Sequence, residues 1–347
     1  MNKHLLDAIL EITSQKEVES LQRAYLSAVM ALYNLHSATI YKVVSSVGAV
    51  KLEKTIDFRA VGSTVDEGGM FIDDLPQNVE ADVDMQECLN SKDIVVTEEG
   101  DSLKLFLPIH TAGVMLSIVC LQGNKIIKSS FEDINYITLV YSNFFILINE
   151  SERDTLTGLY NRRTFDAKLA RMLALQKALK YADVGSSKET EQRDLKADEN
   201  AWLVTIDVDF FKRVNDQFGH VAGDEVLLQL SQMMKEFFRS SDLLFRFGGE
   251  EFVIVLEPIP YDDVWGTLER FRKVVESHVF PLVGSVTIST GFAGIKKQDY
   301  PVTILDFADK ALYFSKEHGR NCIHSYEKLL EAGWLATAGI EGSIDLF

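Results

Sequence analysis

Apolar and polar positions follow two different periods in the N-terminal part of the chain, and the period predicts the type of element. Residues 18–35 and 131–152 have apolar side chains three and four positions apart, which is typical of amphipathic helices. Runs rich in β-branched and aromatic residues at 38–44, 103–109 and 114–121 are typical of strands. We therefore expect a domain in which helices alternate with strands.

The C-terminal part of the chain shows the same alternation after a helical start. The pattern predicts helices at residues 154–176, 226–238, 264–275 and 304–316, and strands at 202–207, 243–256 and 286–293. Residues 183–200 are strongly polar and predict an exposed insertion. Alternating elements of this kind indicate a sheet covered by helices.

The length of 347 residues favours two domains over one. We expect a regulatory domain at 1–130, a linking helix at 131–153, a second domain at 154–325 and a tail at 326–347. The linking helix has apolar residues in the three-four alternation of a coiled-coil seam: Ile134, Ile137, Tyr141, Phe144 and Ile148. This stripe suits either a helix on its own domain's core or a helix that pairs with a second copy, and the two do not exclude each other.

Charge and cysteine content exclude some classes of function. The chain has a formal net charge of −17, which argues against duplex nucleic acid or an anionic membrane surface as its main partner. A small phosphorylated ligand needs only a local cluster of cations and stays possible. The widely spaced Cys88, Cys120 and Cys322 form no metal or disulfide pattern. With neither a signal peptide nor a long apolar run visible, we expect a cytoplasmic protein.

Two clusters of residues in the second domain suit metal and nucleotide chemistry. Asp207 ends an apolar strand, where a carboxylate needs a cation, and Lys212 and Asn215 follow as a point charge and an amide. A glycine pair, Gly248-Gly249, precedes Glu250 and Glu251. Consecutive strand residues point to opposite faces, so only one of the two glutamates can face Asp207 directly. Two carboxylates on neighbouring strands are what a Mg²⁺ site for a nucleoside triphosphate requires. Alternatively, Asp207 caps a surface turn and the glycines form an ordinary hairpin.

A third cluster lies at the end of the last predicted helix. Lys316 and Arg320 are four residues apart on one face, and Gly319 ends the helix. Two cations converging there suit the outer phosphates of a triphosphate, although a solvated helix end has the same appearance.

The order of these motifs resembles the GGDEF family of diguanylate cyclases over residues 154 to about 323. The resemblance is carried by DTLTGLYNRR at 154–163, DVDFFK at 207–212, the signature variant GGEEF at 248–252 and STG at 289–291, together with Lys316 and Arg320. It implies an α/β (α+β) fold whose second domain has a central, mainly antiparallel sheet flanked by helices, similar to the palm of nucleotidyl cyclases. The implied activity is condensation of two GTP molecules into cyclic di-GMP with release of pyrophosphate, in a homodimer.

The resemblance also implies roles for individual residues. Mg²⁺, or Mn²⁺ as a substitute, would be held by Asp207, Glu250 and the carbonyl of Val208, with Glu251 adjacent. Glu251 is also the candidate that helps to deprotonate the attacking hydroxyl. The implied GTP-binding residues comprise backbone amides of the first motif, two guanine-reading side chains, the signature glycines and two phosphate-binding cations: Phe210, Phe211, Lys212, Asn215, Asp224, Gly248, Gly249, Lys316 and Arg320.

Arg239 and Asp242 match the family's RxxD site, at which product binds and inhibits, because Asp242 lies six residues before Gly248. Arg270 in the following helix is expected to assist. The alternative is an ordinary surface ion pair, worth under about 1 kcal/mol.

The N-terminal domain is similar to GAF-like sensor domains by pattern alone, and a PAS-like fold is the competing assignment. The second function that we weigh is a catalytically inactive receptor for GTP or cyclic di-GMP. Such receptors usually lose a metal-binding carboxylate or a signature glycine, whereas this chain retains Asp207, both glycines and both glutamates. A third possibility is a cyclase that makes a different purine dinucleotide.

Overall fold

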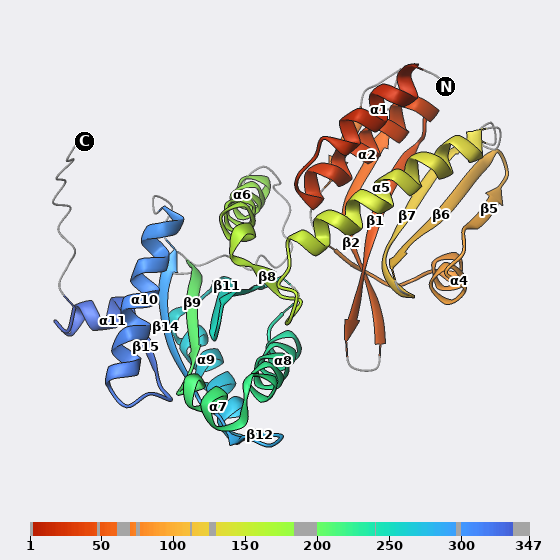
Figure 1. The fold of residues 1–347 in the computed structure, drawn as a ribbon. Helices are drawn as coiled ribbons and strands as arrows, with labels where there is room; N and C mark the ends of the chain where they lie inside the picture. The colour runs from red at the N-terminus through yellow and green to blue at the C-terminus, as the bar shows by residue number, and fades with distance from the viewer. Residues whose placement is uncertain are drawn as a thin grey trace, which may run out of the picture. The chain divides into compact units, whose positions relative to one another are not determined.

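The computed structural model divides into two compact units, Met1–Ser151 and Glu152–Phe347 (Figure 1). It describes residues 3–46, 49–60, 70–73, 77–111, 113–124, 130–183, 200–239, 241–295 and 300–335. Most of the predicted insertion, residues 184–199, and the end of the tail, 336–347, lie outside the described residues. None of the described helices is long and apolar enough to cross a membrane.

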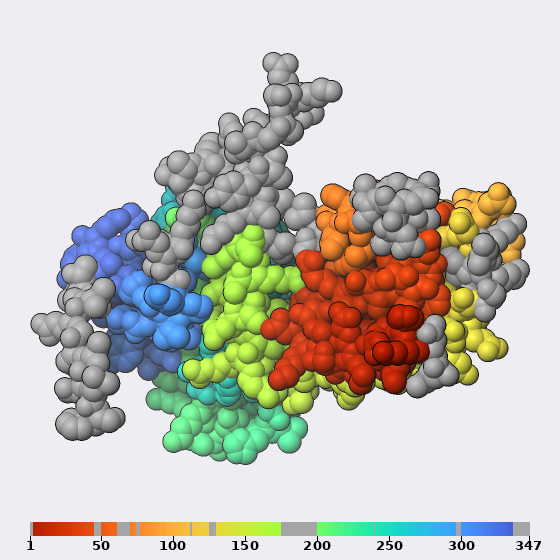
Figure 2. Space-filling view, turned by 90° about the horizontal axis from the view of Figure 1, so that it is seen from above, coloured from red at the N-terminus to blue at the C-terminus, as the bar shows by residue number. Residues whose placement is uncertain are grey.

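Unit 1 is an antiparallel sheet with helices on both faces. Its strands are β1 (Ser37–Ser46), β2 (Ala49–Ala60), β3 (Met70–Asp73), β4 (Gln77–Val79), β5 (Val95–Glu99), β6 (Ser102–Thr111) and β7 (Val114–Asn124). They pair in the order β3-β2-β1-β7-β6-β5, and β4 also pairs with β2. The helices are α1 (Lys3–Thr13), α2 (Val18–Tyr33), α4 (Val83–Ser91) and α5 (Phe131–Ser151). In the space-filling view the red N-terminal residues, α1 among them, form one continuous region of the surface (Figure 2).

Helix α5 packs into the core of unit 1 along the stripe for which we left open a core contact or pairing with a second copy. Ile134, Ile137 and Ile148 are buried against α1, α2 and the sheet. Tyr141 is fully buried, and its ring stacks on that of Tyr25 with centroids 4.2 Å apart. The structure therefore has the first of the two alternatives, a helix on its own domain's core, and this core already covers the residues that would have formed a seam.

The apolar residues that α5 leaves exposed are different ones: Tyr136, Leu139 and Leu147. At about 100° per residue they share one side of the helix. Phe144, the remaining residue of the predicted seam, is only partly buried. The exposed apolar residues of α5 thus lie on the face opposite to the predicted seam.

Unit 2 has a central antiparallel sheet with a parallel strand at each edge. Its strands are β8 (Tyr160–Asn161), β9 (Asn200–Val208), β10 (Leu243–Gly248), β11 (Glu251–Ile259), β14 (Ile288–Ile295) and β15 (Ile323–Ser325), in the order β15-β14-β9-β11-β10-β8. β9 is antiparallel to β11 and β14, while β8 and β15 are parallel to their neighbours. A separate short hairpin joins β12 (Val279–Phe280) to β13 (Gly284–Ser285).

The helices of unit 2 cover both faces of the sheet. They are α6 (Phe165–Asp183), α7 (Phe211–Phe218), α8 (His220–Phe237), α9 (Tyr261–Ser277), α10 (Pro301–Glu317) and α11 (Tyr326–Glu331), with a 3-10 turn at Arg162–Thr164. Side chains that alternate along β9 divide between two cores. Val204 and Ile206 pack with α8 and α9, whereas Leu203 packs with α6 and α10.

The close approach of α10 to the sheet requires a glycine. A Cβ on Gly291 of β14 would lie 2.1 Å from the nitrogen of Leu312 and 2.3 Å from the oxygen of Ala308. The backbone of α10 therefore rests directly on β14. This contact fixes the position of Lys316 in the last turn of the helix.

Most elements of unit 2 lie where the pattern predicted them, with one clear exception. The helix expected at 154–176 begins only at Phe165, because Asp154–Gly158 form a turn and Tyr160–Asn161 pair with β10. The Asp154 carboxylate accepts hydrogen bonds from the backbone and the hydroxyl of Thr157, a local arrangement that competes with a helix.

Candidate functional site

Asp207 lies at the end of β9 on the face covered by α10, where it meets a cation. Its Oδ2 is 2.7 Å from Nζ of Lys316, and the residue is 5% exposed. Burial raises the pKa of Asp207, as do the carboxylates of Glu251 and Asp209, and the ammonium of Lys316 opposes this rise. The strand end thus places a carboxylate where charge is costly and a cation is needed, as the sequence predicted.

The signature hairpin brings both glutamates to this carboxylate. Gly248 and Glu251 pair across the turn between β10 and β11, and Glu251 lies directly opposite Asp207 in the register of β11 on β9. Residues directly opposite share a face of the sheet. Glu250 lies in the turn itself, and its pKa is raised by burial and then by the charge of Asp207. The prediction that one glutamate faces Asp207 and the other works from the turn agrees with this register.

Arg246 holds the signature turn against the start of the unit. Its guanidinium donates to the carbonyl of Gly249 from both Nε and Nη2, and its Nη1 lies 2.9 Å from Oδ1 of Asp154. Burial opposes ionisation of Asp154, but hydrogen bonds from Thr157 and Arg246 outweigh it and lower its pKa. The entry motif and the glycine turn, 92 residues apart, are therefore one connected structure.

Arg320 is held over an aromatic ring next to the strand end. Its guanidinium carbon is 4.6 Å from the ring centroid of Phe210, whose other contact of this kind is Arg213 at 4.5 Å. Phe210 has a φ of 56°, which turns the chain from β9 into α7. The guanidinium of Arg320 is thus oriented before any ligand arrives, as a preorganised anion site requires.

Asp209 positions this cation, and sequence reasoning assigned it no role. The residue is 5% exposed, and its carboxylate accepts from the hydroxyls of Thr287 (2.7 Å) and Ser289 (2.6 Å) and from the backbone N–H of Asn321 (2.9 Å). Asn321 directly follows Arg320, and both have positive φ. The second aspartate of DVDFFK and the serine of STG were the available signals, but nothing in the sequence shows that they meet.

The two residues expected to read guanine lie on the consecutive helices α7 and α8. A Cβ on Gly223 would lie 2.0 Å from Oδ1 of Asn215, so the glycine makes room for the Asn215 side chain. Asp224 follows Gly223 directly on α8 and is exposed. On α7, Lys212 lies about one turn before Asn215 and is also exposed, whereas Phe211 is buried. The structure therefore places the Asn215 side chain against the residue that precedes Asp224 and leaves Lys212 on the surface.

The carboxylates of Asp207 and Glu250 suit a divalent cation whose remaining ligands come from substrate or water. The charge of Asp207 raises the pKa of Glu250, the charge of Glu251 raises the pKa of both, and Lys316 is the neighbouring cation that opposes these shifts at both. Within the described residues, no group of three or more His, Cys, Asp or Glu side chains is already arranged around a metal position. Mg²⁺ is commonly bound by one or two carboxylates plus substrate phosphates and water, and this donor set fits that mode.

The RxxD residues lie apart from the acidic cluster, at the end of α8. The Asp242 carboxylate accepts from the backbone N–H groups of Arg239 (3.0 Å) and Glu257 (3.2 Å), and burial raises its pKa. Arg239 is exposed, and Arg270 on α9 donates to Thr267. The neighbouring rings of Phe238 and Phe271 are 5.0 Å apart, so the segments carrying the two arginines are adjacent.

Residues 151–322 match the family model described as "Diguanylate cyclase, GGDEF domain". This part of the chain is a GGDEF domain. The match includes every residue that we expected to bind GTP or metal, and it ends before α11 and the tail. It does not extend into most of unit 1, so the GAF-like assignment stays a prediction.

Curated relatives of the GGDEF domain include a diguanylate cyclase and a response regulator. Diguanylate cyclase DgcP of Pseudomonas aeruginosa is 34% identical over 171 residues, covering 48% of this chain and 23% of its own length. Response regulator PleD of Caulobacter vibrioides is 30% identical over 203 residues, 57% of this chain and 41% of its own. This chain therefore spans less than half of either relative.

One relative aligns with both units. Diguanylate cyclase A of Treponema denticola is 28% identical over 357 aligned positions, which cover 92% of each chain. Among solved structures, the GGDEF domain of DgcB from Caulobacter crescentus, in complex with c-di-GMP, is 30% identical with a TM-score of 0.42, covering 51% of this chain and 96% of that one.

Proposed function

We propose that the protein is a diguanylate cyclase, which joins two GTP molecules into cyclic di-GMP and releases two pyrophosphates. The observation that carries the proposal is the pairing of Asp207 with Lys316 at 2.7 Å beside Glu250, in a GGDEF domain whose signature glycines and glutamates are all present. Inactive receptors usually lack one of these groups, and so the intact set favours catalysis over binding alone.

The chain's own residues supply charge and orientation for attack on the α-phosphate. Arg320, held on Phe210, and Lys316 are placed to neutralise the outer phosphates, and Asn215 with Asp224 reads the guanine edge. Phosphoryl transfer depends mainly on such positioning and charge stabilisation. Glu251, opposite Asp207 in the sheet, is placed to accept the proton of the attacking 3′-hydroxyl.

Asp207 and Glu250, with the carbonyl of Val208, are the groups that would hold Mg²⁺ or Mn²⁺. A bound divalent cation stabilises charge on the phosphates and lowers the pKa of a coordinated hydroxyl. Lys316 has a second role in this arrangement. Its ammonium balances the negative charge of Asp207 in the absence of substrate, and it moves to the phosphates when GTP binds.

Two copies of the domain are needed, because each binds one GTP and each 3′-hydroxyl attacks the other nucleotide. The exposed apolar face of α5, formed by Tyr136, Leu139 and Leu147, is where we place contact with the second copy. α5 ends at Ser151, directly before the GGDEF domain, and pairing there would set the distance between two catalytic domains.

Regulation is proposed at two further places. Product would bind at Arg239 and Asp242, assisted by Arg270, whose segments are adjacent at the end of α8. Unit 1, which has its own core, would act as the sensor and shift the population of productive dimers in the cytoplasm.

The decisive experiment incubates the full chain with GTP and Mg²⁺ and identifies the products by mass spectrometry. We expect cyclic di-GMP from the wild type and a loss of at least about 100-fold in Glu250→Ala, because a metal ligand is removed. Arg239→Ala should relieve product inhibition while leaving the initial rate unchanged. If GTP binds and no product forms, the receptor function is correct instead.

A further inference from the structure

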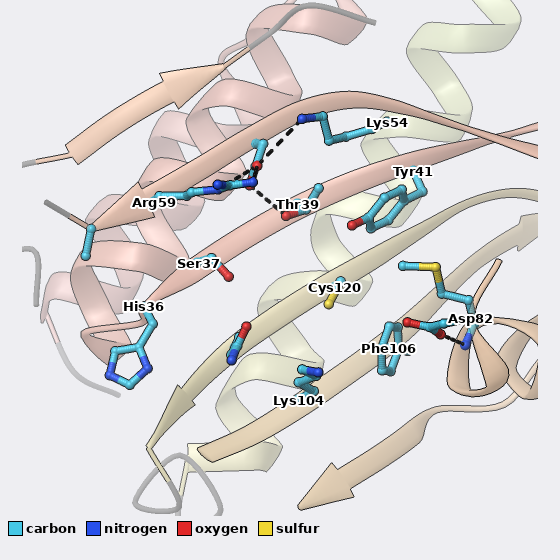
Figure 3. A pocket seen from close by; sticks show the side chains of 14 residues that line it. His36, Ser37, Thr39, Tyr41, Lys54, Arg59, Asp82, Lys104, Phe106 and Cys120 are labelled. Carbon is cyan, nitrogen blue, oxygen red and sulfur yellow. Dashed lines mark hydrogen bonds and ion pairs between the residues drawn. The ribbon is translucent and has the colours of Figure 1, made fainter. Parts of the chain in front are cut away.

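A cavity of about 770 Å³ opens on the face of the unit 1 sheet opposite to α1, α2 and α5 (Figure 3). Its wall is made by alternate residues of adjacent strands, such as Ser37, Thr39 and Tyr41 of β1, and by the first turn of α4 at one end. Alternate strand residues point to one face, and the intervening ones, such as Ile40, pack on the helices. The volume lies within the range of about 300–1,000 Å³ that is usual for small-molecule sites.

A β-bulge brings an extra cation into this wall. The pairing of β1 with β2 shifts by one residue between Ile40 and Tyr41, which face Ile56 and Lys54 respectively. Because of this shift, Lys54 lies on the same face as Asp57 and Arg59, although even and odd positions of a regular strand point to opposite sides. Bulges of this kind commonly re-aim a side chain toward a site.

The charged groups in the wall form a fixed network around one carboxylate. Asp57, 2% exposed, accepts from Oγ1 of Thr39 (2.8 Å) and from Nε of Arg59 (2.8 Å), and Nζ of Lys54 lies 3.8 Å away. Lys54 also lies 3.0 Å from Asp73. Arg59 uses two of the five N–H groups of a guanidinium on Asp57, and its side chain is 62% exposed.

A second wall combines rings with another cation. Phe106 and Tyr41 contribute aromatic surface between the Arg59 end and Asp82 (Figure 3). Burial and the neighbouring Cys120 and Asp57 raise the pKa of Tyr41 to about 12, so its hydroxyl keeps its proton and can donate. Lys104 also lines the cavity, and its acidic partner Glu99 is a largely exposed side chain 3.5 Å away.

We propose that this cavity binds a small organic anion, a carboxylate carried on a flat apolar body. Both acids in the wall have partners within the chain, since Asp57 is bound by Thr39 and Arg59 and Asp82 caps α4 through the N–H of Met85. Lys54 is engaged by Asp57 and Asp73. The groups that meet an anion are therefore the N–H groups of Arg59 that Asp57 does not use and the ammonium of Lys104, whose partner Glu99 is largely exposed. The forked guanidinium of Arg59 suits a carboxylate, and the rings suit the apolar body.

Ligand-observed NMR on the full chain tests the proposal with benzoate, its neutral amide benzamide and the cation benzylamine. Benzoate should bind, and Lys104→Gln should weaken it at least about threefold, which corresponds to losing one partly screened charge. Lys51→Gln, an exposed lysine on the same β2 strand, is the matched control and should change nothing. Arg59→Gln should weaken binding further, but Lys104→Gln avoids disturbing Asp57.

Three results would overturn this assignment. The first is absence of benzoate binding at concentrations up to about 10 mM, a range in which millimolar dissociation constants are detected. The second is equal binding of benzamide or benzylamine. The third is unchanged benzoate binding in Lys104→Gln. The measurement uses no GTP and no turnover, so it is independent of the proposed enzymatic activity.

Discussion

Replacing Asp209 tests whether the buried carboxylate holds the phosphate-binding cations in place. In Asp209→Ala the hydroxyls of Thr287 and Ser289 and the N–H of Asn321 lose their common acceptor. A hydrogen bond to a charged group contributes about 1.5–3 kcal/mol. The two hydroxyls can rotate toward other acceptors, whereas the backbone N–H cannot, and so we expect a total loss of about 3–5 kcal/mol rather than the full sum.

The substitution Asp209→Asn removes the negative charge and keeps the shape of the side chain, so it shows how much of the stability comes from the charge. Its amide oxygen can accept from Thr287 and Asn321, and its NH₂ can donate to Ser289, whose hydroxyl both donates and accepts. We therefore expect a loss of only about 1 kcal/mol. For a domain of this size, 1 kcal/mol corresponds to about 2–4 °C in Tm, so the unit 2 transition should fall by about 6–20 °C in the alanine variant and by a few degrees in the asparagine variant.

Differential scanning calorimetry on the full chain measures the transitions, and titration with GTP under non-turnover conditions measures binding. Because Asn321 follows Arg320, the alanine variant should also bind GTP about tenfold more weakly, or about 1.4 kcal/mol. Asp216→Ala, an exposed acid on α7, is the control and should stay within about 0.5 kcal/mol. An alanine variant that melts and binds GTP like the wild type would refute the positioning role of Asp209.

Three further predictions address the helix contacts and the titration of the site. Gly291→Ala should destabilise unit 2 by several kcal/mol, about 3 or more, since its Cβ would overlap the α10 backbone; Gly294→Ala, whose Cβ would approach only side chains at 3.3 Å and beyond, should cost clearly less by chemical denaturation. Lys316→Gln should move the acid limb of the kcat/KM profile to higher pH, because Lys316 opposes the rise in the pKa of Asp207 and its loss lets protonation of that carboxylate begin at higher pH; an unmoved limb with a merely lower plateau would show that Asp207 does not govern it. Leu139→Glu with Leu147→Glu should give a monomer by light scattering and abolish turnover without lowering Tm, whereas Tyr141→Glu should unfold unit 1, and an active monomer would contradict the dimer proposal.

The sequence predicted the elements of unit 2 best where periodicity and burial agree. β9, β14 and α10 were predicted to within a few residues, because continuous apolar runs and three-four spacing reflect burial directly. The helix predicted from residue 154 failed at its start, since Asp154 accepts a local hydrogen bond from Thr157 and a second one from Arg246, 92 residues away, which the local pattern cannot show. α4, with its weakly amphipathic and mostly polar sequence, gave no clear pattern and was missed.

The candidate site was predictable as a set of residue types but not as a set of contacts. Motif order brought Asp207, Glu250 and Lys316 together correctly, while the pairing of Lys316 with Asp207 itself depends on how closely α10 approaches β14 at Gly291. The apolar stripe of α5 is a second case in which the sequence indicates residue types but not their contacts. A three-four stripe records only that a face is covered, and in this chain Tyr25 and the core of unit 1 cover it.

Asp209 is a residue whose role the motif does not predict, because its contacts are made with distant parts of the chain. The strand alternation sends Asp207 toward α10, and the turn after Val208 sends Asp209 toward β14 and the loop that follows α10. One aspartate therefore contacts the cation that is expected to meet phosphate, and the other fixes the backbone beside the second such cation. A single short segment thereby couples the strand end to both Lys316 and Arg320, so that substitutions at Asp209 should change nucleotide affinity without removing any group that touches the nucleotide.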